Sequence, residues 1–146
     1  MTMVFIPLGD GRIAADNVAS PAQTFVSGFG TGVPNATRYI RPGVPGAITA
    51  EGLMSFPRAG VLRNFYVYAE TPPGGVVTDT LTVRRTTGGV TSDTLIIVAL
   101  TGTQKAGSDL VNSVSVLAGD GLSVKIVAGA SSATANLTWT IEWMPS

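Results

Sequence analysis

Apolar and polar residues alternate with a period of two along most of the chain after residue 37. The clearest stretches are 60–70, 78–85, 122–128 and 136–144. A period of two places successive side chains on opposite faces of a β-strand, so each stretch has one apolar face. No stretch shows the 3.6-residue period of an amphipathic helix. The pattern therefore predicts an all-β chain.

Turn-forming residues separate these stretches at fairly regular intervals. Glycine, proline, asparagine and aspartate lead the breaks because they accept the backbone angles of tight turns. The hairpin signal is strongest where Gly88-Gly89 separates two alternating runs. About eight strands joined in this way are typical of an antiparallel β-sandwich or jelly roll. The first expected strand begins at residue 37 and is ended by Pro42-Gly43. The others cover 47–56, 60–70, 78–85, 90–100, 110–117, 122–128 and 136–144.

The closing strand carries both tryptophans of the chain. Trp139 and Trp143 share a face with Ile141, whereas Thr140 and Glu142 lie on the other face. A pair that stacks on a ligand would need exposed aromatic rings interleaved with hydrogen-bond donors, which this pattern does not offer. We therefore expect the tryptophans to lie in the core. The other inward positions that we expect are Leu81, Val83, Leu122, Val124, Ile126 and Leu137.

The strand at 60–70 carries a second aromatic pair. Strict alternation places Leu62, Tyr66 and Tyr68 on one face, together with Asn64 and Glu70. Two interpretations remain open for these residues, packing in the core and contact between subunits. Exposed aromatic residues on a sheet are favoured anchors at protein interfaces. We take Leu62, Tyr66 and Tyr68 as candidate subunit-interface residues.

Residues 1–36 differ from the remainder and form an irregular, apolar N-terminal arm in this interpretation. Glycine, proline, serine and asparagine interrupt the segment every few residues, yet it is more apolar than a disordered linker. The arm either packs on its own domain or becomes ordered against a partner. Its candidate partner-binding residues are Val4, Phe5, Ile6, Phe25 and Phe29, and residues 37–146 form the sandwich domain.

The composition argues against most catalytic and binding chemistries. The chain has no histidine and no cysteine, so Ser-His-Asp and Cys-His catalysis and thiolate metal sites are absent. Nine basic residues balance nine acidic ones, which is not the charge pattern of a nucleic-acid-binding protein. Arg84-Arg85 is expected at a solvated hairpin tip or, alternatively, against an acidic partner. We expect no enzyme activity, no cofactor, no metal site and no membrane span.

The segments "AGVLRNFYVYAE", "DTLTVRR", "GGVTSDTLIIVAL", "SVSVLAGDGLSVKI" and "TWTIEW" together resemble small jelly-roll domains of tailed-phage structural proteins. The same rhythm of strands resembles tumour-necrosis-factor-like and C1q-like trimers. The resemblance covers roughly residues 50–146 and rests on strand periodicity. Chains of this length in that group resemble capsid decoration, or cement, proteins.

The resemblance implies a homotrimer on the outer surface of a phage capsid. Its partners would be the major capsid protein and two further copies of itself, and it would bridge and stabilise the capsid subunits. An alternative from a different class is a receptor- or carbohydrate-binding module of a tail fibre or head fibre. Its ligand would then be carried by the loops at 71–75, 101–109 and 129–135.

Overall fold

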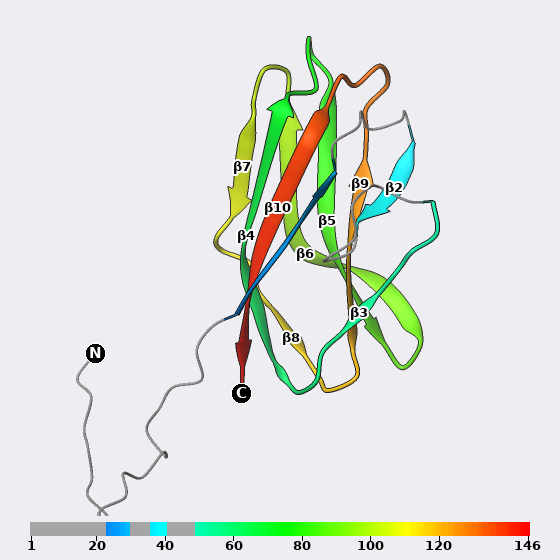
Figure 1. Cartoon of the computed structure of the whole chain (residues 1–146), viewed down its shortest axis with the longest axis vertical. Coiled ribbons are helices and arrows are strands. Elements are labelled where there is room, and N and C mark those ends of the chain that lie inside the picture. Colours follow the sequence, from blue (N-terminus) through cyan, green and yellow to red (C-terminus); the bar gives the residue numbers. More distant parts are fainter. Residues whose placement is uncertain (1–22, 30–35, 41–48) are drawn as a thin grey trace, which may run out of the picture.

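The fold is an all-β sandwich, as predicted. The computed structural model describes residues 23–29, 36–40 and 49–146 of the chain. These residues form ten strands in two antiparallel sheets that pack face to face, with no helix among them (Figure 1). No helix in this part of the chain could therefore cross a membrane.

The first sheet has the order β1-β10-β4-β7, and β8 pairs with the other end of β4. Strand β4 is the central strand, since it contacts β10 along one edge and both β7 and β8 along the other. The strands are β1 (Gln23–Phe29), β10 (Ala135–Pro145), β4 (Gly60–Thr71), β7 (Ala106–Asp109) and β8 (Val114–Val116).

The second sheet has the order β2-β9-β5-β6, and β3 pairs with the beginning of β9. The predicted hairpin at Gly88-Gly89 is present and joins the two longest strands of this sheet. The strands are β2 (Thr37–Ile40), β3 (Met54–Ser55), β5 (Thr78–Thr87), β6 (Val90–Thr101) and β9 (Gly121–Val127).

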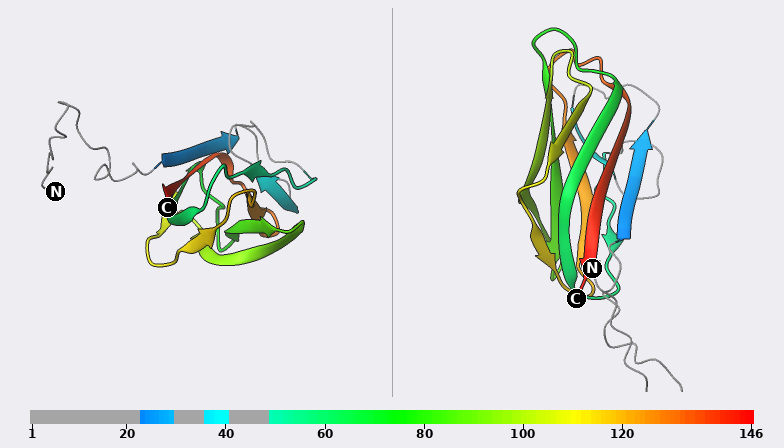
Figure 2. Two further views of the ribbon diagram at one scale, coloured as in Figure 1. Left: turned by 90° about the horizontal axis from the view of Figure 1, so that it is seen from below. Right: turned by 90° about the vertical axis from the view of Figure 1, so that its left-hand side faces the viewer.

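The chain passes repeatedly from one sheet to the other. Strand β4 belongs to the first sheet, β5 and β6 to the second, β7 and β8 to the first, β9 to the second and β10 to the first. This interleaving distinguishes a jelly roll from a pair of simple meanders. The two layers are seen edge-on in Figure 2. The β4–β5, β6–β7 and β9–β10 loops meet at the end of the sandwich away from the C-terminus (Figure 1).

The core lies between the sheets and contains both tryptophans. Trp139 and Trp143 are 1% and 2% exposed, and their rings contact Phe65 and Phe56 at centroid distances of 6.0 and 5.6 Å. The prediction of core tryptophans is confirmed. The expected inward residues of β5, β9 and β10 are also fully buried: Leu81, Val83, Leu122, Val124, Ile126, Leu137 and Ile141.

A β-bulge in β4 changes which residues face the core. Tyr66 pairs with Thr140, but Arg63 pairs with Glu142, so two residues of β4 oppose the single residue between them on β10. Asn64 adopts a left-handed conformation with φ of 53°, as is common for asparagine at such sites. The extra residue reverses the alternation, and Leu62 becomes fully buried. Our placement of Leu62 on the same face as Tyr66 and Tyr68 was therefore wrong.

Three predicted segments differ from the observed strands. Within the expected strand 47–56, only β3 is a strand among the described residues, and the expected strand 110–117 shrinks to β8. Strand β7 lies inside a segment that we expected to be a loop. Its sequence, Ala-Gly-Ser-Asp, lacks apolar alternation, and its glycine lies close to β6. A Cβ at Gly107 would lie 2.7 Å from Val98 Cγ1.

Part of the predicted arm belongs to the first sheet. Residues 23–29 form β1, which pairs antiparallel with β10, so that Phe25 lies opposite Ile141 and Phe29 opposite Leu137. Val4, Phe5 and Ile6 lie outside the described residues. The division of the chain at residue 36 stays a prediction.

Replacing Gly60 with alanine is expected to destabilise the fold by about 2–3 kcal/mol, because overpacking forces rigid neighbours to move. A Cβ at this position would lie 2.2 Å from Trp143 Nε1 and 2.5 Å from the backbone oxygen of Met144. Urea unfolding followed by tryptophan fluorescence measures the change. Ser115→Ala, at an exposed site on the neighbouring strand β8, is the control and is expected to change stability by no more than about 0.5 kcal/mol. Equal midpoints for the two variants would contradict the packing described for Gly60.

Candidate functional site

The outer face of the first sheet carries an uncharged depression beside two exposed tyrosines. Beyond the bulge, β4 turns Tyr66 and Tyr68 outward, and their exposed fractions are 49% and 50%. The depression has a volume of about 440 Å³. We call this surface the tyrosine face; its lining residues are Tyr66, Val67, Tyr68, Ala106, Gly107, Ser108, Thr138, Trp139 and Thr140.

Strand register brings these residues together from three strands. Tyr66 lies opposite Thr140 on β10 and opposite Ser108 on β7, while Tyr68 lies opposite Thr138 and Ala106. Directly opposed residues in an antiparallel sheet project to the same side, so hydroxyl groups and small side chains surround both rings. The face can therefore bury aromatic surface against a partner and donate or accept hydrogen bonds there. Contact between subunits through Tyr66 and Tyr68 stays a prediction.

Charged groups at the two ends of the tyrosine face are paired within the chain. At one end Glu142 Oε2 accepts hydrogen bonds from Asn64 Nδ2 at 2.8 Å and from Arg63 Nε at 3.3 Å. At the other end Asn136 Nδ2 donates to Glu70 Oε2 at 2.6 Å. The bulge at Asn64 thus positions a polar border, while no charged residue lines the depression itself.

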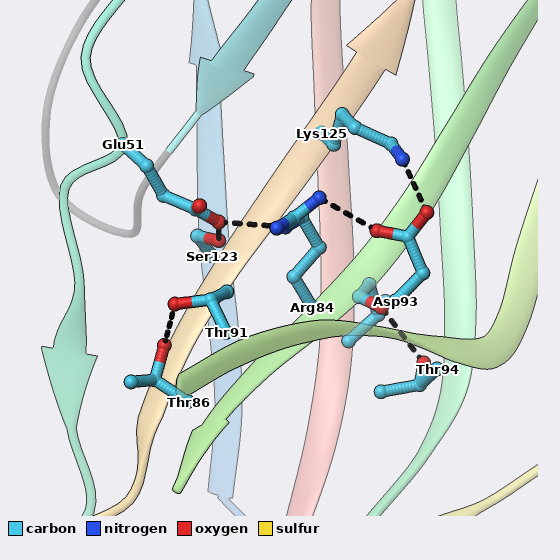
Figure 3. Close-up of polar contacts among 9 residues, drawn as sticks. Glu51, Arg84, Thr86, Thr91, Asp93, Thr94, Ser123 and Lys125 are labelled. Carbon is cyan, nitrogen blue, oxygen red and sulfur yellow. Dashed lines mark hydrogen bonds and ion pairs between the residues drawn. The ribbon is translucent and has the colours of Figure 1, made fainter. Parts of the chain in front are cut away.

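The outer face of the second sheet carries a network of ion pairs in which acidic and basic side chains neutralise one another (Figure 3). Arg84 Nε lies 2.8 Å from Glu51 Oε1, and Arg84 Nη1 lies 2.7 Å from Asp93 Oδ1. Lys125 pairs with the other oxygen of Asp93, and Ser123 donates to Glu51. The network therefore links β5, β6 and β9 with the segment that precedes β3.

Arg84 and Arg85 both form ion pairs with acidic residues of the same chain. The Arg84 side chain is only 16% exposed, and its guanidinium also lies over the ring of Tyr39, 5.6 Å from the ring centroid. Arg85 pairs with Asp120 at 2.7 Å. Neither arginine is therefore the freely solvated group that we expected at a hairpin tip, and neither needs an acidic partner for neutralisation.

Asp79 is a fully buried carboxylate that fastens the β9–β10 loop to β5. It accepts hydrogen bonds from Gly129 N at 2.9 Å, Ser132 Oγ at 2.7 Å and Thr134 Oγ1 at 2.5 Å. Three donors thus satisfy the oxygens of this buried carboxyl group. The part of the chain that the structure describes holds no group of three or more carboxylate, histidine or cysteine residues placed for metal binding.

Asp109 fastens the β7–β8 loop to the edge of the second sheet. It accepts hydrogen bonds from Ile97 N at 3.1 Å, Val111 N at 3.2 Å, Asn112 N at 3.0 Å and Asn112 Nδ2 at 2.9 Å. Burial alone raises the pKa of Asp109, but these hydrogen bonds outweigh it and hold the pKa below its ordinary value of 3.8. The carboxylate is therefore ionised when the fold is intact at neutral pH.

Replacing Asp109 with alanine is expected to cost about 2–3 kcal/mol at pH 7, because buried donors lose their acceptor. A lowered folded-state pKa means that the stabilisation is complete above the ordinary pKa and is lost as the pH falls through the folded-state pKa. Between pH 5 and pH 2, roughly, the wild type is thus expected to lose more stability than Asp109→Ala. Urea unfolding across this pH range provides the measurement. Identical pH dependences for the two proteins would contradict the role given to Asp109.

Comparison with known proteins supports the fold. No known family matches the sequence, and no curated protein is significantly similar to it. A chain from the acidic stable capsid structure of Helicobacter pylori bacteriophage KHP30 is similar, with a TM-score of 0.54 and 9% identity over 88% of this chain and 92% of that chain. The zebrafish complement 1qA globular domain has a TM-score of 0.48, with 12% identity over 86% and 96% of the two chains.

Murine APRIL is similar with a TM-score of 0.43 and 10% identity, over 84% of this chain and 99% of its own. The scores of APRIL and of the complement domain are too low to carry an argument. The likeness to the phage capsid chain is one of fold alone, because only 9% of the residues are identical. The expected jelly roll is confirmed.

Proposed function

We propose that the chain is a structural virion protein, a homotrimeric decoration protein on the outside of a phage capsid. In this proposal it binds the major capsid protein and bridges neighbouring capsid subunits. The observation that carries the proposal is the tyrosine face, an uncharged surface built on the adjacent strands β10, β4 and β7. The fold that this chain shares with a chain of a phage capsid structure supports a place in the virion.

The tyrosine face suits contact between protein subunits. Tyrosine is enriched at the centre of protein interfaces, whereas lysine, glutamate and aspartate are depleted there. A surface with net charge near zero also favours association over repulsion. Burying two half-exposed rings removes apolar area from water and restricts few rotatable bonds.

Trimer formation would also explain how a small protein holds a capsid. Three copies on one particle engage several sites at once, so modest contacts combine into tight attachment. A protein that binds only the assembled shell stabilises that shell by mass action. The bound trimers would thus strengthen the capsid without any chemical reaction.

The apolar residues near the N-terminus give a direct test of capsid binding. A chain in which Val4, Phe5 and Ile6 are replaced with serine is expected to occupy purified expanded heads at least about tenfold less well, since each trimer loses several apolar contacts. Occupancy is measured by gel densitometry after the heads are sedimented. The replacement is preferable to a deletion that extends into β1, because β1 belongs to the first sheet.

Val76→Ser is the matched control, since Val76 is an exposed apolar residue in the β4–β5 loop. It is expected to leave occupancy unchanged. Undiminished binding of the triple variant would remove the N-terminal residues from the proposed capsid contact.

Carbohydrate binding is the second candidate function, and one observation favours it. Tyr66 and Tyr68 present half-exposed rings beside the hydroxyl-bearing residues Ser108, Thr138 and Thr140. A sugar ring offers both an apolar face and hydroxyl groups, so it could stack there. A glycan array decides between the two. Specific hits that disappear with Tyr68→Ala would favour the carbohydrate-binding alternative, and a blank array would favour the decoration protein.

A further inference from the structure

Two short strands, β2 and β3, form one edge of the second sheet. Among the described residues both pair with β9 alone, β2 through four residue pairs and β3 through two. Ile40 and Phe56 anchor them in the core, where both side chains are buried. We call residues 37–40 and 49–56 the β2–β3 edge. Short strands with few pairing partners open more readily than the centre of a sheet, so this edge depends on further contacts to stay closed.

A single arginine from the interior of the sheet contacts both parts of this edge. Arg84 lies on β5 opposite Ser123 of β9, and its side chain reaches across β9. Its Nε lies 2.8 Å from Oε1 of Glu51, which precedes β3, and Figure 3 shows this carboxylate directed toward the guanidinium. The guanidinium carbon lies 5.6 Å from the ring centroid of Tyr39 on β2, a cation–π distance. Arg84 thus joins β2 and the segment before β3 to β5.

Other side chains hold this ion pair in place. Asp93 on β6 lies 2.7 Å from Arg84 Nη1 and also pairs with Lys125 on β9. Ser123 donates a hydrogen bond to Glu51. The Arg84 and Glu51 side chains are only 16% and 18% exposed, so water and salt screen their attraction less than that of an exposed pair. Of the four charged groups, Glu51 alone belongs to the β2–β3 edge, so its loss affects the edge and leaves the pairing of β5 with β6 and β9 intact.

We propose that the ion pair between Glu51 and Arg84 controls local opening of the β2–β3 edge. While the pair is formed, the edge stays closed on the sandwich. When the pair is broken, β2 and β3 separate from β9 while the other strands stay folded. The open form exposes the side chains of Ile40 and Phe56 together with the free edge of β9, and an unpaired strand edge readily pairs with another chain. The ion pair therefore protects the fold from such pairing.

Native-state hydrogen exchange of the intact protein, followed by NMR at neutral pH, tests this opening, because the exchange rate of a protected amide reports how often its segment opens. The probe is the Phe56 amide, which donates to the Asp120 oxygen at 2.9 Å. Glu51→Gln keeps the shape of the side chain and removes its charge. In this variant the Phe56 amide is expected to exchange about tenfold faster, because a poorly solvated ion pair has lost one partner. The Ala69 amide on β4, which donates to the Lys105 oxygen at 2.7 Å, is expected to keep its rate.

Glu142→Gln is the matched control, because it removes a carboxylate from the ion pair with Arg63 on the other sheet. It is expected to leave the exchange rate of the Phe56 amide unchanged. Equal rates for this amide in the wild type and in Glu51→Gln would overturn the inference. Acceleration of the Phe56 and Ala69 amides by the same factor would also overturn it, because that result indicates global destabilisation instead of local opening. Neither outcome bears on the proposed function, since the ion pair lies within one chain.

Discussion

Replacing Trp139 with alanine is expected to lower the free energy of unfolding by about 3–5 kcal/mol, the range observed when a buried aromatic residue is deleted from a core. Trp139 is 1% exposed and lies between the sheets, where its ring contacts Phe65. A loss of this size is a large share of the stability of a typical domain. Urea unfolding at pH 7, followed by circular dichroism, provides the measurement.

Trp139→Phe is the matched control for this prediction. The indole nitrogen of Trp139 finds no hydrogen-bond acceptor in the described part of the chain. Phenylalanine keeps most of the apolar surface and removes a donor that is costly to bury without a partner. We expect a loss of at most about 1.5 kcal/mol. A loss for Trp139→Phe as large as that for Trp139→Ala would show that the indole nitrogen has a partner that matters.

Replacing both Tyr66 and Tyr68 with aspartate is expected to dissociate the proposed trimer. Two carboxylates would have to lose their hydration in an uncharged interface, and this costs far more than the tyrosine contacts contribute. The mass from light scattering is expected to fall from about 45 kDa, three times the chain mass, to 14.9 kDa. Capsid occupancy is expected to fall by about a hundredfold or more because the advantage of multiple attachment is lost.

Thr80→Asp is the control for the tyrosine pair, because Thr80 lies on β5 in the opposite sheet and is partly exposed. It adds a carboxylate to the sandwich without touching the tyrosine face. This control is expected to remain a trimer. Retention of the trimer by the tyrosine variant would show that subunits meet through another surface.

The sequence was most informative where one face of a strand is buried and no bulge interrupts it. Leu122, Val124 and Ile126 alternate without interruption and are all fully buried. The hairpin at Gly88-Gly89 was equally clear, because both glycines adopt positive φ angles that other residues avoid. Strand β7 was not predicted because it has no apolar face of its own. It is held in the sheet by pairing with β4 and by packing against β6.

The tyrosine face could be predicted in part. Two-residue spacing is enough to place Tyr66 and Tyr68 on one side of β4, and the structure brings them together. Leu62 was misassigned because the bulge at Asn64 depends on the register with β10, which is a tertiary property. An asparagine within an apolar strand is the one local signal of such a bulge.

The exposure of Leu95, Leu110 and Val111 could not be predicted from the sequence. Leu95 stands at the start of the apolar run 95–100, which has the appearance of a uniformly buried strand. In β6 the residues alternate between the two faces, so Leu95 and Ile97 point outward while Ile96 lies in the core. Because every residue of the run is apolar, the sequence does not show which face is buried. Leu110 and Val111 were predicted to lie in a strand. In the structure they lie in a loop, where Val111 N donates a hydrogen bond to the Asp109 carboxylate.

The mass of the wild-type protein in solution tests the central claim most directly. Multi-angle light scattering over a range of protein concentrations gives this mass without any reference to a capsid or a ligand. We predict a stable species of about 45 kDa, three copies of the 14.9 kDa chain. A single species of 14.9 kDa at every concentration would contradict the account, because the tyrosine face would then have no second copy to cover it.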